Sequence, residues 1–203
     1  MKQKKKIAFD ALPALKADIR EFVLGKRDSL PKKQIKSKSA AIAKKLFSLP
    51  EFKKAKTIFT YVSFGSEADT KHIVEKCIAS GKKVAIPCAD MKSKNLGIFE
   101  FTSYSSLRKS TYGILEPVPA KSKKVPASEI DFVVVPGVAF DKKCNRIGYG
   151  LGFYDRFFSK HRKIPNAALA FELQVLGSVP AGKKDGKVHG IITEKRAIKC
   201  GKI

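Results

Sequence analysis

The chain has 203 residues, 43% of them hydrophobic, and a net charge of +24 from 42 Lys and Arg against 18 Asp and Glu. No apolar run approaches the ~18 residues that span a membrane, and no apolar segment follows the basic N-terminus as in a signal peptide. We therefore expect a soluble, cytoplasmic protein without a membrane partner. We expect one domain over residues 1–203, with residues 1–10 as a basic, flexible N-terminus.

The excess of positive charge has three explanations. The first is attraction of polyanions, including nucleic acid. The second is capture of a small anionic substrate, and the third is adaptation to the salt or proteome of the cell. The lysines are scattered along the chain, and we find no helix-turn-helix pattern and no aromatic RNA-binding motif. Nucleic-acid binding is therefore not the primary function that we predict.

The four cysteines are Cys77, Cys88, Cys144 and Cys200. None belongs to a C-x-x-C pair, and no histidine lies beside one at the spacing of a metal site. We predict reduced thiols, not a disulfide framework or a zinc site.

Residues 11–28 are predicted to form a helix, because apolar residues recur there at helical spacing. These residues are Leu12, Leu15, Ile19, Phe22 and Val23. Lys16 and Arg20, four positions apart, share one side of this helix. Two cations so placed could receive a phosphate chain; the alternative is a solvated basic face.

The next part of the chain alternates between helix and strand patterns. A second helix is predicted between Pro31 and Pro50. A polar loop with Glu67 follows the first strand, and this acid is either a ligand residue or an ordinary loop acid. In chain order the patterns predict a strand at 57–64, a helix at 70–80, strands at 83–87 and 96–101, and a proline-limited loop at 113–119.

The clearest strand is the apolar run DFVVVPG at 131–137, whose end at Pro-Gly is typical of a central parallel strand. We then expect a loop at 138–152, a helix at 153–161, and strands at 166–172 and 188–193. Strands thus alternate with helices. The predicted fold is an α/β three-layer sandwich with a largely parallel central sheet flanked by helices.

The segment RIGYGLGFYDRFF, residues 146–158, follows the clearest strand, where ligands bind in α/β sheets. Gly148, Gly150 and Gly152 allow positive φ angles and a close approach of the backbone to a ligand. Backbone N–H groups at the start of the next helix, together with Arg146, could bind phosphate. The spacing G-x-G-x-G matches neither a dinucleotide fingerprint nor a Walker A loop, so a tight structural turn stays the alternative.

Asp155 lies one helical turn after these glycines. Its carboxylate suits Mg²⁺, and the alternative is an acid that only stabilises the helix N-terminus. Asp185 lies in a Lys- and Gly-rich loop that is weakly informative by itself.

Residues 133–157, VVVPGVAFDKKCNRIGYGLGFYDRF, resemble the signature of the 5-formyltetrahydrofolate cyclo-ligase family, also called 5,10-methenyltetrahydrofolate synthetases. That signature usually reads P-G-x-x-F-D-x-x-G-x-R-x-G-x-G-x-G-Y-Y-D. Further segments resemble the family in the same order: LKADIR, YVSFGSEADT, GILEP, FELQ and DGKVHGIITE. The resemblance covers roughly residues 12 to 195.

The resemblance implies a role for each candidate residue. ATP phosphates would be bound by Lys16, Arg20, Arg146 and the backbone of Gly148, Gly150 and Gly152. Glu67 would meet the pterin ring, Tyr149 and Phe153 would line the folate and formyl side, and Asp155 and Asp185 would serve Mg²⁺. The implied catalytic residues are Arg146, Tyr149 and Asp155.

The implied reaction is the ATP- and Mg²⁺-dependent cyclisation of 5-formyltetrahydrofolate to 5,10-methenyltetrahydrofolate, with release of ADP and phosphate. Such catalysis is mostly positioning and charge neutralisation. The implied partner is a reduced folate, also as a polyglutamate, and we expect a monomer.

Four positions depart from the family pattern: Cys144, Leu151, Phe153 and His189. They bear on rate and specificity more than on the class of reaction. Two alternatives stay open: a non-catalytic relative that binds RNA or another polyanion, and a related ATP-using enzyme with another substrate.

Overall fold

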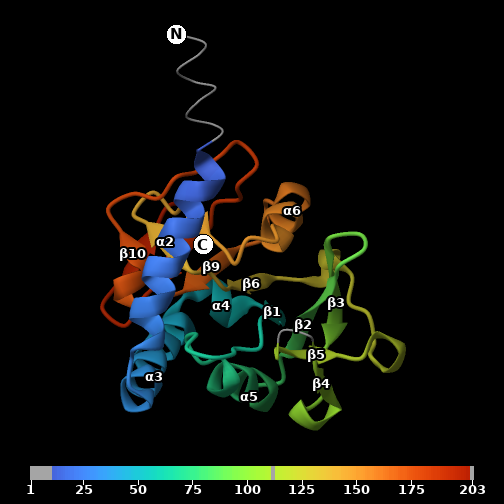
Figure 1. Ribbon diagram of the computed structural model, residues 1–203. Coiled ribbons are helices and arrows are strands. Elements are labelled where there is room, and N and C mark those ends of the chain that lie inside the picture. The colour runs from blue at the N-terminus through green and yellow to red at the C-terminus, as the bar shows by residue number, and fades with distance from the viewer. Residues whose placement is uncertain (1–10, 111–112, 202–203) are drawn as a thin grey trace.

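The computed structural model of the protein describes residues 11–110 and 113–201 (Figure 1). The segment 1–10, predicted to be flexible, lies outside the described residues. The helices are α2 (Leu12–Asp28), α3 (Lys32–Ser48), α4 (Pro50–Lys54), α5 (Lys71–Ala79) and α6 (Phe153–Lys160). Short 3₁₀ turns are η1 (Tyr104–Ser106), η2 (Pro119–Lys121), η3 (Ala127–Glu129) and η4 (Glu172–Gln174). Each helix in this described part is too short or too polar to cross a lipid bilayer.

A seven-stranded sheet forms the centre of the molecule. In spatial order its strands are β12 (Ala197–Lys199), β11 (Gly190–Ile192), β9 (Asn166–Leu169), β6 (Phe132–Val135), β1 (Thr57–Thr60), β2 (Lys83–Asp90) and β3 (Asn95–Glu100). The strands from β11 to β2 pair in parallel, and only β12 and β3 at the two edges are antiparallel. The prediction of a largely parallel sheet is confirmed.

Helices cover both faces of this sheet (Figure 1). Successive side chains of a strand point to opposite faces, and β6 shows this clearly because it is buried on both. Phe132 and Val134 belong to the core beneath α3, α4 and α5. Val133 and Val135 belong to the core beneath α6. The predicted three-layer sandwich is therefore confirmed.

The predicted loop at 138–152 contains a hairpin. Its strands are β7 (Ala139–Asp141) and β8 (Arg146–Ile147), and β10 (Val175–Leu176) joins β7 to make a small second sheet. Val23 of α2 packs on this sheet together with Val138 and Ile147. Strands of two or three residues are too short to show alternation in the sequence, so the loop prediction was wrong here.

Two other segments also differ from prediction. The loop expected at 113–119 contains β5 (Leu115–Pro117), which pairs with β4 (Leu107–Lys109). Pro117 is compatible with β5 because each strand of a two-stranded sheet is an edge strand, where the missing N–H of proline need not break a hydrogen bond between strands. Pro50 does not only follow the second helix; it begins α4, since proline suits the first turn of a helix.

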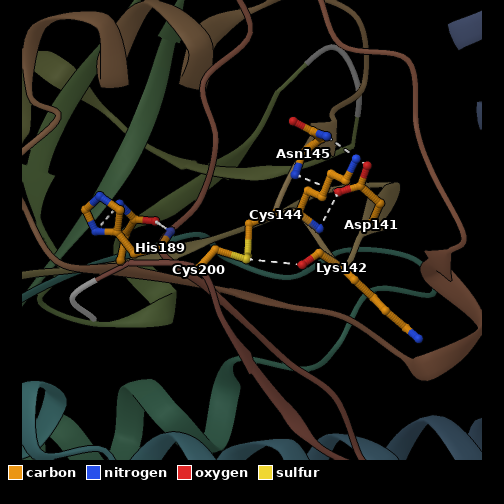
Figure 2. The surroundings of a disulfide bond; sticks show 8 residues. Asp141, Lys142, Cys144, Asn145, His189 and Cys200 are labelled. Carbon is orange, nitrogen blue, oxygen red and sulfur yellow. Dashed lines mark hydrogen bonds between the residues drawn. A yellow bond between two sulfur atoms is a disulfide. The ribbon is translucent and has the colours of Figure 1, made fainter.

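Cys144 and Cys200 form a disulfide, so the prediction of four reduced thiols is wrong for this pair (Figure 2). Cys144 lies in the β7–β8 turn, and Cys200 directly follows β12. The N–H of Val188 donates to the Cys144 carbonyl, and the N–H of Cys200 donates to the His189 carbonyl. The segment at 188–189 thus brings together cysteines 56 positions apart, a contact that sequence spacing cannot indicate. Cys77 and Cys88 are free, as predicted.

Candidate active site

A cavity of about 700 Å³ opens where β1 and β6 end. Tyr61 and Val62 follow β1, Pro136 follows β6, and all three line the cavity. This carboxyl edge is where open α/β sheets bind ligands. All of the candidate residues predicted from the sequence line this one cavity: Lys16, Arg20, Glu67, Arg146, Gly148, Tyr149, Gly150, Gly152, Phe153, Asp155 and Asp185.

The glycine loop between β8 and α6 forms one wall of the cavity. Gly150 has a φ of 107° and Gly152, at the N-terminus of α6, a φ of 66°, values that other residues adopt only with strain. Gly148 has no such angle, but a Cβ there would lie 2.6 Å from the guanidinium of Arg146. From α2, the Arg20 Nε donates to the Gly148 carbonyl at 2.7 Å. The positive φ angles of Gly150 and Gly152 and the close approach of Arg146 to Gly148 therefore account for the three glycines.

Two ion pairs lie at the same end of the cavity. The Lys16 Nζ is 2.5 Å from Asp185 Oδ2, and an Arg146 terminal nitrogen is 2.7 Å from Asp155 Oδ1. The backbone N–H of Gly186 also donates to Asp155, at 3.1 Å, which brings the loop of Asp185 against the start of α6. The sequence could not show that the two acids predicted to serve Mg²⁺, Asp155 and Asp185, each pair with a candidate cation.

Arg146 is 6% exposed, and its Nε has no hydrogen-bond partner among the described residues. Its guanidinium also lies 5.7 Å from the ring centre of Tyr154. A buried donor of a charged group without a partner is costly, so this nitrogen is available to an acceptor that enters the cavity. An anionic oxygen is the acceptor that suits a guanidinium best.

The acidic groups suit a magnesium ion that is bound together with a phosphate chain. No cluster of three or more His, Cys, Asp or Glu side chains occurs in residues 11–110 and 113–201, so these residues form no all-protein metal cage. Mg²⁺ commonly takes only one or two carboxylates and completes its shell with phosphate oxygens and water. Asp155 and Asp185 at the cation-lined end of the cavity fit that pattern.

Glu67 is the buried acid of the cavity, and it is held by two donors. The Tyr149 hydroxyl donates to its Oε1 at 2.8 Å, and the Phe64 N–H donates to its Oε2 at 3.2 Å. Burial raises the pKa of Glu67 to about 7, although both hydrogen bonds and the charge of Arg27 act in the opposite direction. Burial and the neighbouring Glu67 likewise raise the pKa of Tyr149. Glu67 therefore changes its charge near neutral pH.

Sequence reasoning missed the apolar wall of the cavity and the buried Arg27. The wall comes from β2, the β2–β3 turn, β3 and β5, and includes Pro87, Met91, Leu96 and Leu115. Such residues look like ordinary core or loop positions until the pairing of β2 with β3, and of β5 with β4, places them around the cavity. Arg27 carried one usable signal, since it continues the basic side of the helix that holds Lys16 and Arg20.

The four departures from the family pattern lie at identifiable places. Cys144 has a φ of 58°, the left-handed region where glycine is usual. Leu151 is exposed and lines the cavity. The ring of Phe153 lies 5.4 Å from the Arg156 guanidinium. The backbone N–H of His189 donates to the Asn166 side chain, away from the cavity.

Comparison with known proteins places the chain in a family. A sequence model of the 5-formyltetrahydrofolate cyclo-ligase family matches residues 13–194. A probable 5-formyltetrahydrofolate cyclo-ligase of Caenorhabditis elegans is 30% identical over 93% of this chain and 97% of its own length. The Escherichia coli 5-formyltetrahydrofolate cyclo-ligase is 27% identical over 84% of this chain and 96% of its own length.

Among solved structures, the 5,10-methenyltetrahydrofolate synthetase of Aquifex aeolicus superposes with a TM-score of 0.79 at 31% identity. The match covers 92% of this chain and 93% of that one. The Mycoplasma pneumoniae enzyme of the same name shares the fold at 21% identity, with a TM-score of 0.72. The chain therefore belongs to the 5-formyltetrahydrofolate cyclo-ligase family.

Proposed function

We propose that the protein cyclises 5-formyltetrahydrofolate to 5,10-methenyltetrahydrofolate at the expense of ATP. One observation carries the proposal: every candidate residue lines a single cavity, with paired cations and carboxylates at one end. The buried acid Glu67 and an apolar wall complete the lining. Family membership supports the same reaction.

The charged end would bind ATP. Positive charge comes from Lys16, Arg20 and Arg146, whose Nε has no partner in the described part of the chain. The loop of Gly148, Gly150 and Gly152 brings backbone N–H groups to the start of α6. Such groups bind phosphate oxygens and stabilise charge that develops in phosphoryl transfer.

Asp155 and Asp185 would hold Mg²⁺ at this end. When bound, the ion neutralises phosphate charge and helps to orient the phosphate chain. The chain's own contribution is to keep these two acids beside Lys16 and Arg146, as the present ion pairs do.

The other end would bind the reduced folate, with Glu67 on the pterin and Tyr149 and Phe153 beside the formyl group. The formyl oxygen would bond to the γ-phosphorus of ATP while the bond to the β-phosphate oxygen breaks, which releases ADP. N10 would then bond to the formyl carbon and lose its proton, while the carbon–oxygen bond breaks and phosphate leaves. These steps need alignment of the reactants more than a protein nucleophile, and the cavity lining would supply that alignment.

The first test is the rise of methenyl absorbance from 5-formyltetrahydrofolate with and without ATP and Mg²⁺. We expect formation of product only when both are present, and its absence from the complete mixture would overturn the proposal. Strong, salt-dependent RNA binding by an inactive protein would instead favour a polyanion-binding relative.

The second test is Asp155→Asn. We expect a loss of about 100-fold or more in kcat, because the variant removes a carboxylate from the proposed metal site and the charge partner of Arg146. An unchanged circular dichroism spectrum would show that the fold is retained. Full activity in this variant would exclude Asp155 from the mechanism.

A further inference from the structure

Arg27, in the last turn of α2, is a buried cation that the proposed reaction does not use. It is 3% exposed and does not line the cavity. Its Nε donates to the Ser66 hydroxyl at 2.8 Å, and a terminal nitrogen donates to the Tyr149 hydroxyl at 3.0 Å. An arginine is almost never buried to this extent unless it is paired, so its two partners carry information about its role.

Both partners are hydroxyl groups, and each of them donates its own hydrogen to an acid. The Ser66 hydroxyl donates to Asp28, and the Tyr149 hydroxyl donates to Glu67 at 2.8 Å. Within the described residues, no carboxylate oxygen lies within salt-bridge distance of Arg27 itself. Arg27 is therefore linked to Glu67 by two hydrogen bonds that meet at the Tyr149 hydroxyl, and its charge also acts on Glu67 directly.

This arrangement determines the direction of the Tyr149 hydroxyl. A guanidinium is only a donor, so the Tyr149 oxygen must accept from Arg27. A tyrosine hydroxyl has one hydrogen, and with Arg27 in place that hydrogen is directed to Glu67. Without Arg27 the hydroxyl would be free to accept from Glu67 or from a molecule in the cavity instead.

We infer that Arg27 is a positioning residue for folate binding: it directs the Tyr149 hydroxyl onto Glu67 and stabilises the Glu67 carboxylate that meets the substrate. This inference rests on the proposed function, because it takes the Glu67 end of the cavity as the folate end. Arg27 itself touches neither substrate nor reacting atoms.

The surroundings of Glu67 give the inference a pH signature. Glu67 is faced by the hydroxyl of Tyr149, the N–H of Phe64 and the charge of Arg27, and its charge in turn acts on Tyr61 and Tyr154. Arg27 is the cation among these groups, and it lowers the pKa of Glu67 against the effect of burial. Its removal should raise that pKa further and leave Glu67 protonated at neutral pH.

The experiment compares Arg27→Met and Arg27→Lys with Lys26→Met, the matched removal of the exposed cation next to it. Binding of 5-formyltetrahydrofolate is measured calorimetrically from pH 6 to 9, and KM for folate and for ATP is measured at pH 7. For Arg27→Met we expect folate affinity about 10- to 100-fold lower at pH 7, with KM for ATP within about 2-fold of wild type. Folate affinity should rise with pH as Glu67 loses its proton. In Arg27→Met the midpoint of this rise should lie about one pH unit higher than in the wild type.

Arg27→Lys keeps the charge but loses the fork of donors, so its pH profile should stay closer to wild type than that of Arg27→Met. Lys26→Met should change neither affinity nor profile. An unchanged pH profile in a folded Arg27→Met protein, or equal losses for folate and ATP, would overturn the inference.

If Arg27→Met does not fold, Arg27→Lys and Tyr149→Phe form a double-mutant cycle. The lysine substitution should cost folate affinity in the wild type and much less once the Tyr149 hydroxyl is absent. Additive losses would contradict the inference. A wild type that binds folate but forms no product would overturn the proposed function alone, whereas a wild type without folate binding would overturn both.

Discussion

At the scale of single residues, Glu67 shows how burial changes the protonation of an ordinary acid. It is 5% exposed, and this burial raises its pKa to about 7. In the unfolded chain the pKa of this side chain should be near 4.5, the ordinary value for glutamate. The folded state therefore holds more protons between these two values, and the contribution of Glu67 to stability falls as the pH rises through that window.

Glu67→Gln should stabilise the protein at high pH while it weakens folate binding. The variant removes a buried charge that costs about 3 kcal/mol above pH 7, so the free energy of unfolding should rise by about 2 kcal/mol more at pH 8 than at pH 5. Urea unfolding at the two pH values measures this difference. Glu75→Gln, an exposed acid on α5, is the control and should show little pH-dependent change. Equal effects of Glu67→Gln at both pH values would contradict the raised pKa.

At the scale of elements, helix α2 and the glycine loop position the charged end of the cavity together. Lys16 and Arg20 come from α2 and contact Asp185 and the Gly148 carbonyl. The loop follows a hairpin that presents Arg146 from β8. Helix α2 was predictable because its apolar residues recur over several turns. The hairpin was not, because β7 and β8 become visible only through their pairing with each other and with β10.

Gly148→Ala tests the close approach of Arg146 to this loop. The new methyl group would displace the guanidinium, since the Cβ would lie 2.6 Å from it, and loosen its pair with Asp155. We expect kcat/KM for ATP to fall by about 10- to 100-fold with a small change in stability.

The control is Gly25→Ala on α2, where a Cβ would meet nothing within 4 Å. It should raise the free energy of unfolding by about 0.5–1 kcal/mol, because alanine suits a helix interior better than glycine, and leave the kinetics unchanged. Wild-type kinetics in Gly148→Ala would show that Arg146 tolerates the displacement.

At the scale of the whole molecule, the disulfide joins the β7–β8 hairpin, which precedes the glycine loop, to the residue that follows the edge strand β12 (Figure 2). The bond joins two residues that are 56 positions apart in the sequence.

The positive charge is also a property of the whole molecule. In the described part of the chain only Lys16, Arg20 and Arg146 among the basic residues line the cavity, so most of the excess lies elsewhere.

Cys200→Ser should lower the free energy of unfolding by about 2–4 kcal/mol under oxidising conditions, because the unlinked chain gains entropy when it unfolds. The wild type in dithiothreitol should lose a similar amount, whereas dithiothreitol should not affect the variant. Thermal unfolding with and without reductant measures these differences. Alkylation of four thiols in the oxidised, denatured wild type would contradict the link.

The sequence by itself determined the layer architecture and the central parallel strands, and its resemblance to the cyclo-ligase family indicated the charged residues and glycines that line the cavity, but not the apolar wall. Periodicity in long segments and the spacing within RIGYGLGFYDRFF are local properties of the chain, so they can be recognised without knowledge of the fold. The tertiary structure alone decided the Cys144–Cys200 link, the pairing of Asp155 with Arg146, and the burial of Arg27 behind Tyr149. These features join residues from distant segments, and they depend on desolvation and hydrogen-bond geometry that exist only once the chain has packed.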